Sequence, residues 1–235
     1  MQLVGIALLV FVVWFGFADR TEAGISALDV HALVVVFLGS TSAVLVSSTG
    51  SSALRTLAAL RECVPGLRRF KQDTHRYDQA REKLATLWTE GKRSAAVEIS
   101  EGSGAALVKT MMELLLTRAS PARIQKVFLE LRHAEIEHWQ PAILNWEMLS
   151  KLGPAFGMVG TITGMVSVFR NMSSENMNIG ASMSMALLAT LYGVAFGTGL
   201  AGPLGHYLNG LLDDRLGLLE RCEKTVFELL SLKER

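Results

Sequence analysis

The chain has 235 residues, 23 of them basic and 22 acidic, so its formal net charge is +1, and half of its residues are hydrophobic. This balance provides no basic field that attracts phosphates, and nucleic acid is excluded as an expected partner. Charged residues make up 19% of the chain, against about 25% in an ordinary soluble domain. They gather in blocks that separate four almost uncharged stretches, which predicts an integral membrane protein.

The first two uncharged stretches cover residues 3–18 and 30–48. A transmembrane helix needs about 20 mostly apolar residues to cross a bilayer core of about 30 Å, so the first stretch is short. No basic residue precedes it, and residues 18–20 (Ala-Asp-Arg) do not form a small-residue cleavage site. We therefore expect a retained helix here and not a cleaved signal peptide.

The third and fourth uncharged stretches cover residues 152–169 and 180–208. They are rich in Gly, Ala, Ser and Thr, and neither contains Asp, Glu, Lys or Arg. A side chain that carries a proton or cation through a membrane is normally ionisable and faces the interior of the helix bundle. If this chain moves ions, the titrating carboxylate must therefore come from another polypeptide.

The distribution of Lys and Arg predicts the orientation. Residues 49–151 carry sixteen of them and the tail after Tyr207 carries five, whereas the other two connections carry only Arg20 and Arg170. Basic residues accumulate on the cytoplasmic side of membrane proteins. Both the 49–151 block and the C-terminal tail are therefore expected in the cytoplasm, and four spans then place the N-terminus there as well.

The cytoplasmic block has helical periodicity. Residues 53–70 and 78–99 carry amphipathic patterns, and a helix is expected to begin at Pro121 and to bend at Pro141 before it enters the third span. The sequence thus predicts an all-α membrane protein with four transmembrane helices and a large helical cytoplasmic domain between the second and third. Its expected parts are a first helix pair (1–48), the cytoplasmic domain (49–151), a channel-side helix pair (152–208) and a cytoplasmic C-terminal helix (209–235).

Small and hydroxyl residues recur along the last two predicted spans. Glycines at small-xxx-small spacing allow helix backbones to approach closely, either within one bundle or around partner helices, and periodicity does not separate these alternatives. A hydroxyl bonds its own backbone carbonyl four residues earlier, or it helps to dehydrate a passing ion when two align at one depth. The candidates for the ion path are Thr161, Thr190 and Thr163, and bends are expected at Pro154 and Pro203.

Residues 153–164 read GPAFGMVGTITG. This run resembles the signature PAxGMxGTxxG of the MotA and PomA stator subunits, which belong to the MotA/TolQ/ExbB family. The pair IG at 179–180 and the run MALLATLYG at 185–193 resemble IGxxMxxALLTTLYG. Pro203 falls where the family has a second proline, and Asp29 resembles the acidic residue that enters its second span. The layout matches over nearly the whole chain.

The resemblance implies a flagellar stator that couples an ion flow to torque. It implies a pentameric ring of these subunits in the bacterial inner membrane, around a MotB-like single-span protein that supplies an intramembrane Asp. It implies that Thr161 and Thr190 face the ion path, that Pro154 and Pro203 couple ion binding to movement, and that charged residues of the cytoplasmic block push on a FliG-like rotor protein. Whether the ion is a proton or sodium stays open.

One departure concerns the segment that contacts the rotor in this family. Aligned on Gly91, the family's Arg and Glu positions are occupied here by Trp88 and Ala96. The charged residues nearby are either shifted rotor contacts or an ordinary solvated face, so a TolQ/ExbB-like or gliding-type machine is the alternative. TolQ and ExbB have one span before the cytoplasmic domain, and the two expected here favour the MotA branch. The rotor-contact candidates are Lys92, Arg93, Glu98 and Glu101.

Other classes of protein have little support in the sequence. Residues 133–138 read HAEIEH, which is not the HExxH zinc motif and does not place its histidines on one helix face. No catalytic triad elbow or phosphate loop is present, so neither an enzyme, a metal site nor a cofactor other than the transported ion is expected. A secondary transporter normally has internal repeats, and a structural scaffold would need no partner carboxylate.

Overall fold

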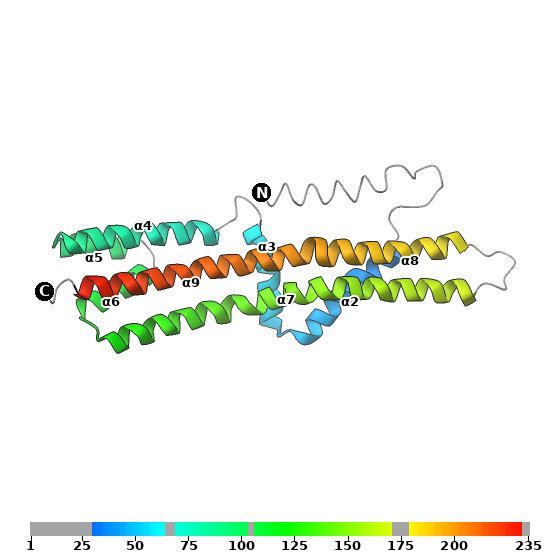
Figure 1. Ribbon diagram of the computed structural model, residues 1–235, viewed down its shortest axis with the longest axis horizontal. Coiled ribbons are helices and arrows are strands. Elements are labelled where there is room, and N and C mark those ends of the chain that lie inside the picture. The colour runs from blue at the N-terminus through cyan, green and yellow to red at the C-terminus, as the bar shows by residue number, and fades with distance from the viewer. Residues whose placement is uncertain (1–29, 64–68, 103–105, 171–178, 232–235) are drawn as a thin grey trace. The chain divides into compact units, whose positions relative to one another are not determined.

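The computed structural model describes residues 30–63, 69–102, 106–170 and 179–231 (Figure 1). The predicted first span, 3–18, and Asp29 lie outside the described residues. Every regular element in the described ranges is a helix, which confirms the expected all-α class. The elements are α2 (Val30–Ser47), α3 (Gly50–Cys63), α4 (Arg69–Thr89), α5 (Arg93–Gly102), α6 (Ala106–Leu116), α7 (Pro121–Arg170), α8 (Ile179–Val194), the π-helix η2 (Ala195–Ala201) and α9 (Gly202–Ser231).

These helices form two compact units. The first unit lies within Met1–Cys63 and Pro141–Leu208, and the second lies within Val64–Gln140 and Asn209–Arg235. Helices α7 and α9 each contribute to both units. The first unit therefore contains the predicted second, third and fourth spans, and the second unit contains α4, α5 and α6.

In the first unit, α2 packs against α8 through small and branched side chains. Ala32 and Val36 of α2 are buried with Leu188 and Ala189 of α8. A chain of polar contacts then fastens the turn after α2 to α7: Asn145 accepts a hydrogen bond from Ser48 at 2.8 Å and donates one to the Thr56 hydroxyl at 2.7 Å. The following helix, α3, is thereby anchored along its polar side.

Helix α3 exposes its leucines and buries its small polar side. Leu54, Leu57 and Leu60 are exposed, whereas Thr56 and Ala59 are buried. The amphipathic pattern predicted from residue 53 is present, but the apolar face points outward because the inward face is occupied by the hydrogen bonds of Thr56 to α7.

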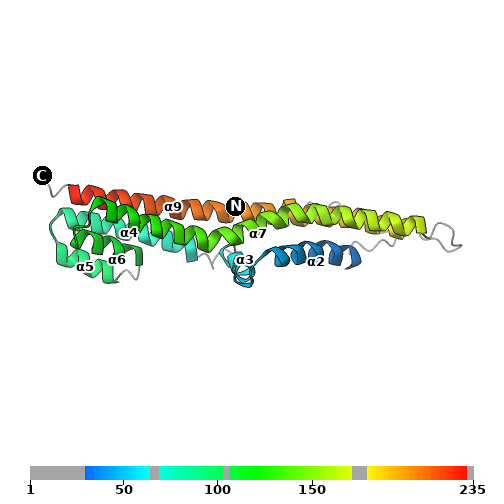
Figure 2. The same ribbon diagram turned by 90° about the horizontal axis from the view of Figure 1, so that it is seen from below.

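The second unit has a core of large apolar side chains contributed by four helices. Leu84 of α4, Met111 of α6, Phe128 of α7 and Leu218 of α9 are fully buried in it. Figure 2 shows α4, α5 and α6 gathered beside the first part of α7 and the last part of α9. Ion pairs join the helices at the edge of this core, among them Arg132 with Glu223.

The helix predicted over 78–99 is interrupted, because Gly91 ends α4. Its φ of 77° is left-handed, and the Gly91 and Lys92 amides donate to the Trp88 and Leu87 carbonyls at 3.2 and 3.0 Å. This is the Schellman arrangement, in which glycine is favoured because it has no Cβ.

A second turn of the same kind ends α6 without a glycine. The Arg118 and Ala119 amides donate to the Leu115 and Leu114 carbonyls at 3.4 and 3.0 Å, and Arg118 has a φ of 47°. A left-handed conformation costs a residue with a Cβ about 1–2 kcal/mol. Arg118 is therefore held in a conformation that glycine would adopt more easily.

Prolines modify the long helices without ending them. Pro141 and Pro154 both lie inside α7, which continues over 50 residues. Pro203 follows η2, in which the Gly202 amide donates to the Gly197 carbonyl five residues earlier. A proline has no amide hydrogen and its ring conflicts with the carbonyl four residues back. The wider π-turn before Pro203 accommodates that ring.

Candidate functional site

Glycines bring α7 into direct backbone contact with α8 and η2. A Cβ added at Gly153 would lie 2.7 Å from the Gly197 Cα, and one added at Gly193 would lie 2.5 Å from the Gly153 carbonyl oxygen. No side chain fits at these positions unless the helices move apart. The small-residue pattern of the sequence therefore serves packing within one chain at this contact.

The close approach continues toward the threonines. A Cβ at Gly157 would lie 3.1 Å from the Thr190 Cα, and one at Gly160 would lie 2.3 Å from the Ala189 Cβ. Because the backbones are this close, side chains as short as threonine can reach across the contact.

Thr161 of α7 and Thr190 of α8 meet at this point. Their hydroxyls are hydrogen-bonded to each other. The Thr161 hydroxyl also lies 3.1 Å from the Gly157 carbonyl oxygen and 3.2 Å from that of Ala186. Thr190 approaches the same two carbonyls at 3.4 and 3.5 Å. We call these two side chains and two carbonyls the threonine pair site.

The threonine pair site offers oxygen atoms and no charge. Each hydroxyl proton faces three acceptors, the two carbonyl oxygens and the other hydroxyl oxygen, so the protons can exchange partners at little cost. Both threonines are half-buried, and each hydroxyl retains lone pairs. The arrangement can replace water around a cation or a hydrated proton, but it cannot take up a proton at neutral pH.

The third ion-path candidate, Thr163, is not part of this site. It is exposed, and its hydroxyl donates to the Gly160 carbonyl at 3.0 Å. Thr198 of η2 likewise bonds the Val194 carbonyl at 2.8 Å. These two show the local backbone bonding that is common for threonine in helices.

The coupling candidates lie on either side of η2. A Cβ at Gly197 would lie 2.5 Å from the Pro154 Cδ, so Pro154 packs directly on η2. Pro203 stands just after the end of η2 and is exposed. Both prolines thus border the same irregular segment.

The rotor-contact candidates lie in the turn before α5 and along α5 itself. Lys92 is exposed and forms an ion pair with Glu90 at 2.8 Å, and the hydrogen bond to Glu90 raises the pKa of Lys92. The Arg93 guanidinium lies 5.5 Å from the Trp88 ring centre. Glu98 is exposed on α5, and Glu101 lies near the end of that helix.

Burial explains why the position of the family's Glu carries no charge in this chain. Ala96 is fully buried in the core of the second unit. A carboxylate at this position would have to leave water without compensation, which is costly. An exposed charge on α5 must therefore come from another position of the helix, such as Glu98.

Sequence reasoning missed the backbone half of the threonine pair site. The Gly157 and Ala186 carbonyls have no sequence signature, although each lies four residues before one of the threonines. That spacing is the signal that could have identified them.

Comparisons with known proteins agree with this architecture. A model of the MotA/TolQ/ExbB proton channel family matches residues 91–221. Motility protein A of Aquifex aeolicus is 32% identical over 103 residues, 43% of this chain and 38% of the relative. Motility protein A of Cereibacter sphaeroides is 33% identical over 108 residues, 45% of this chain and 41% of the relative. The matched part thus spans about two fifths of these relatives.

Solved structures share the fold over almost the whole chain. The C. jejuni MotAB structure superposes with a TM-score of 0.74 at 17% identity, covering 98% of this chain and 89% of that one. The flagellar MotAB stator complex of Bacillus subtilis gives a TM-score of 0.74 at 19% identity, with 97% and 89% covered. These likenesses establish the fold of the chain.

Proposed function

The chain belongs to the MotA/TolQ/ExbB proton channel family, and we propose that it is a flagellar stator subunit. In this proposal it forms, with a MotB-like partner, a complex that couples the flow of protons or sodium ions to torque on the rotor. The relatives named Motility protein A and the fold shared with MotAB stator complexes support this role.

The observation that carries the proposal is a hydroxyl pair between two apolar helical stretches, 152–169 and 180–208, that contain no Asp, Glu, Lys or Arg. The stretches Pro121–Arg170 and Met183–Ser231 are long and apolar enough to cross a membrane, and Thr161 and Thr190 meet between them. Such a site can dehydrate an ion but cannot titrate. It therefore fits a complex in which an Asp from the single-span partner binds the ion.

The proposed topology has four spans in the inner membrane, with both termini in the cytoplasm. The second and third spans fit α2 and the later half of α7, the fourth fits α8 with η2, and the first is assigned to 3–18. The four parts 1–48, 49–151, 152–208 and 209–235 follow from this layout. Exposed apolar side chains such as Met158, Ile162 and Leu187 would face lipid, the partner helix or the next subunit of a pentamer.

The proposed mechanism uses the irregular segment η2 as the moving part. Pro154 packs on η2 from α7 and Pro203 follows η2 in the chain, so each of the two helices that meet here lacks one amide donor of its own hydrogen-bond ladder. Binding of an ion beside the threonine pair would shift the carbonyls of α7 and α8. That shift is expected to reach the second unit through α7 and α9, and there the exposed charges would act on the rotor.

The contribution of the threonine pair to ion flux can be tested by removing one hydroxyl at a time. Replacing Thr161 or Thr190 with Val keeps the shape but removes a donor and an acceptor, and we expect ion flux to fall by about tenfold or more, equivalent to one lost hydrogen bond. Ser at either position should restore most of the flux. Thr198→Val is the matched control because that hydroxyl bonds only its own helix.

The measurement is ion flux through vesicles that contain the full complex, taken over a sodium series and a pH series. A fall in flux that depends on sodium identifies sodium as the coupling ion, and one that depends on pH identifies the proton. Equal flux in the Thr161→Val, Thr190→Val and Thr198→Val complexes would remove the threonine pair from the ion path.

A TolQ/ExbB-like or gliding-type role is the second candidate, and one observation favours it. The segment that contacts the rotor in flagellar stators has Trp88 and a buried Ala96 here in place of two charged residues. Deleting the gene separates the candidates: loss of swimming with an intact envelope supports the flagellar role, and loss of gliding or of envelope energisation supports the other.

A further inference from the structure

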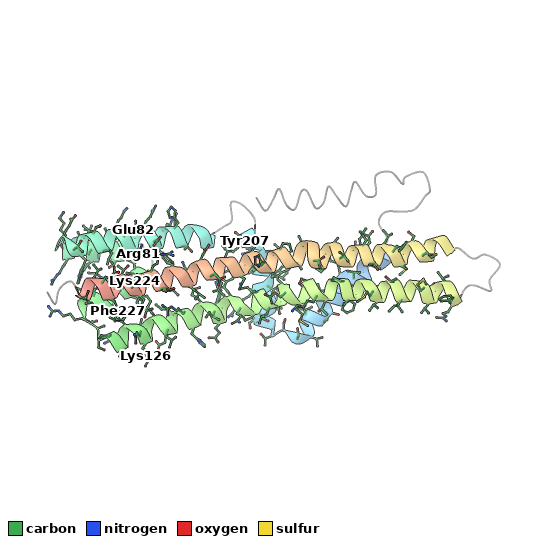
Figure 3. The ribbon with its side chains drawn as sticks, in the orientation of Figure 1. Arg81, Glu82, Lys126, Tyr207, Lys224 and Phe227 are labelled. Atoms are coloured by element: carbon green, nitrogen blue, oxygen red, sulfur yellow. The ribbon has the colours of Figure 1, made fainter. Side chains whose placement is uncertain are left out.

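The π-helix η2 is held from two sides through its consecutive residues Phe196 and Gly197. Tyr207, labelled in Figure 3, lies on α9 shortly after this segment. On one side, the Phe196 ring contacts the ring of Phe37 on α2, with 4.3 Å between the ring centres and 41° between the ring planes. On the other side, a Cβ added at Gly197 would lie 2.5 Å from the Pro154 Cδ on α7. The segment therefore touches both α2 and α7.

A second aromatic ring fastens α2 directly to α7. A Cβ added at Gly39 of α2 would lie 2.6 Å from the Phe156 Cε1 of α7, so the Phe156 ring fills the space that the missing side chain leaves. The rings of Phe37, Phe156 and Phe196 are all half-buried. Because α2 cannot slide along α7 without expelling the Phe156 ring from its place on Gly39, the Phe37 ring has a fixed position against η2.

The helical spacing of η2 determines what these contacts oppose. A π-turn contains one residue more than an α-turn, because its amide bonds the carbonyl five residues earlier and not four. In η2 the Gly202 amide makes such a bond to the Gly197 carbonyl. Successive residues of an α-helix are rotated by about 100°, so a return of η2 to α-helical spacing would rotate the residues before it by that angle relative to those after it. Phe196 and Gly197 lie within the segment that would turn, and their contacts oppose the rotation.

The two contacts of η2 differ in how easily they open. The Gly197 contact is made by backbone, and breaking it requires η2 and α7 to move apart. The contact between Phe37 and Phe196 joins two side chains, and an aromatic pair contributes a factor of about two to ten to an equilibrium constant. A contact of this strength can set the rate of a conformational step without blocking it.

We propose that Phe37 is a positioning residue of the ion path, which holds η2 in its π-helical form through Phe196 and thereby sets how fast this segment moves. The inference rests on the proposed function, in which η2 is the moving part of the helix that carries Thr190. It gives α2, the second proposed span, a role in the conformational step besides crossing the membrane.

The test removes the ring on α2 and keeps an apolar side chain in its place. In the complete complex with its single-span partner, Phe37→Leu should raise the amide hydrogen exchange of residues 200–202 about fivefold, because the π-turn opens more often. Phe37→Tyr keeps the ring and should stay within about twofold of the original complex. Leu38→Ala is the matched control on the same helix, because Leu38 is 62% exposed, and it should leave this exchange unchanged.

Exchange in residues 186–190 of α8 distinguishes positioning from packing in general. If Phe37 only stabilises the contact between α2 and α8, Phe37→Leu raises exchange in α8 as much as in η2. The proposal predicts an increase confined to η2. It also predicts no further increase when Phe37→Leu is combined with Phe196→Leu, because both changes remove one shared contact. An equal increase in α8, or additive increases in the double variant, would overturn the positioning role.

Ion flux in vesicles separates this inference from the proposed function. The Phe37→Leu complex should show a maximal flux raised about fivefold, in step with the exchange in η2. The half-saturating ion concentration should stay unchanged, because the oxygens of the threonine pair site remain in place. If the original complex conducts no ions, the proposed function is wrong. If it conducts, and Phe37→Leu changes neither the exchange in η2 nor the flux, or lowers the flux, then Phe37 does not position the ion path.

Discussion

The two units differ in the kind of side chain that lies at their helix contacts. In the first unit the contact between α7 and α8 consists of Gly153, Gly157, Gly193 and a pair of threonines. Several large apolar side chains of the same stretches point outward, among them Met158, Ile162 and Leu187. In the second unit the large apolar side chains are inside, and the ion pairs lie at the edge.

This difference in packing is the one expected between a unit that folds in water and a unit that folds in lipid. In water, burying large apolar side chains drives folding, which is the arrangement of the second unit. In lipid this driving force is absent, and helices associate through close backbone packing and hydrogen bonds between them. Helix α7 buries large apolar side chains up to Leu149, whereas from Gly153 onward its inward face carries glycines and Thr161 and its large apolar side chains point outward.

The largest expected effect comes from emptying the core of the second unit. Phe128 is 0% exposed and its neighbour Leu129 is 64% exposed. Phe128→Ala should destabilise the protein by about 4 kcal/mol, whereas Leu129→Ala should change the stability by less than about 0.5 kcal/mol. Thermal unfolding of the two purified variants measures both. Equal losses of stability in the two variants would show that the second unit has no buried apolar core at Phe128.

A smaller effect is expected from adding one carbon to the glycine contact of the first unit. Gly193→Ala places a Cβ 2.5 Å from the Gly153 carbonyl oxygen, and overpacking of this kind costs about 2 kcal/mol. Gly210→Ala is the control, because a Cβ there meets nothing within 4 Å, and it should stabilise α9 by about 1 kcal/mol. If both variants are stabilised, the helices are not in glycine contact.

The smallest of the three effects concerns the thiol in the core of the second unit. Burial raises the pKa of Cys222 from its ordinary value near 9.0 to about 12. The unfolded chain therefore loses the thiol proton first, so the contribution to stability is complete below about pH 9 and is lost as the pH rises toward 12.

A full pKa unit corresponds to about 1.4 kcal/mol, and because the unfolded thiol is already half deprotonated at pH 9, the unfolding free energy should fall by about 1 kcal/mol between pH 9 and pH 10 through this group alone. Cys222→Ala lacks the titrating proton and should show a correspondingly flatter decline over the same range. Identical pH profiles for the two proteins would place Cys222 in contact with water.

Much of the fold could be predicted from the sequence because it depends on patterns within single segments. The second, third and fourth apolar stretches contain α2, the later half of α7 and the α8–η2 helix, as expected from their length and composition. The family resemblance implies that Thr161 and Thr190 face one ion path, and their direct contact follows only from the structure. Their spacing in the chain does not place them together; the glycines opposite each other on α7 and α8 do.

What could not be predicted depends on contacts between distant segments. The outward leucines of α3 result from hydrogen bonds that Asn145 and Trp146 make to Thr56, and amphipathic periodicity does not tell which face is inside. The sequence shows that Thr163 has a hydroxyl but not which way it points, and in the structure it bonds the Gly160 carbonyl of its own helix. The pocket lined by Trp88, Leu115 and Phe227 combines residues of α4, α6 and α9, and no local motif marks it.

The central claim is that this chain provides a hydroxyl-lined ion path, whereas the titrating carboxylate belongs to the single-span partner. The most direct measurement is ion flux in liposomes that contain the chain alone, compared with liposomes that contain the chain and its single-span partner. The account predicts flux only in the second preparation, and loss of that flux when the partner's intramembrane Asp is changed to Asn. Full flux through the chain alone would contradict it.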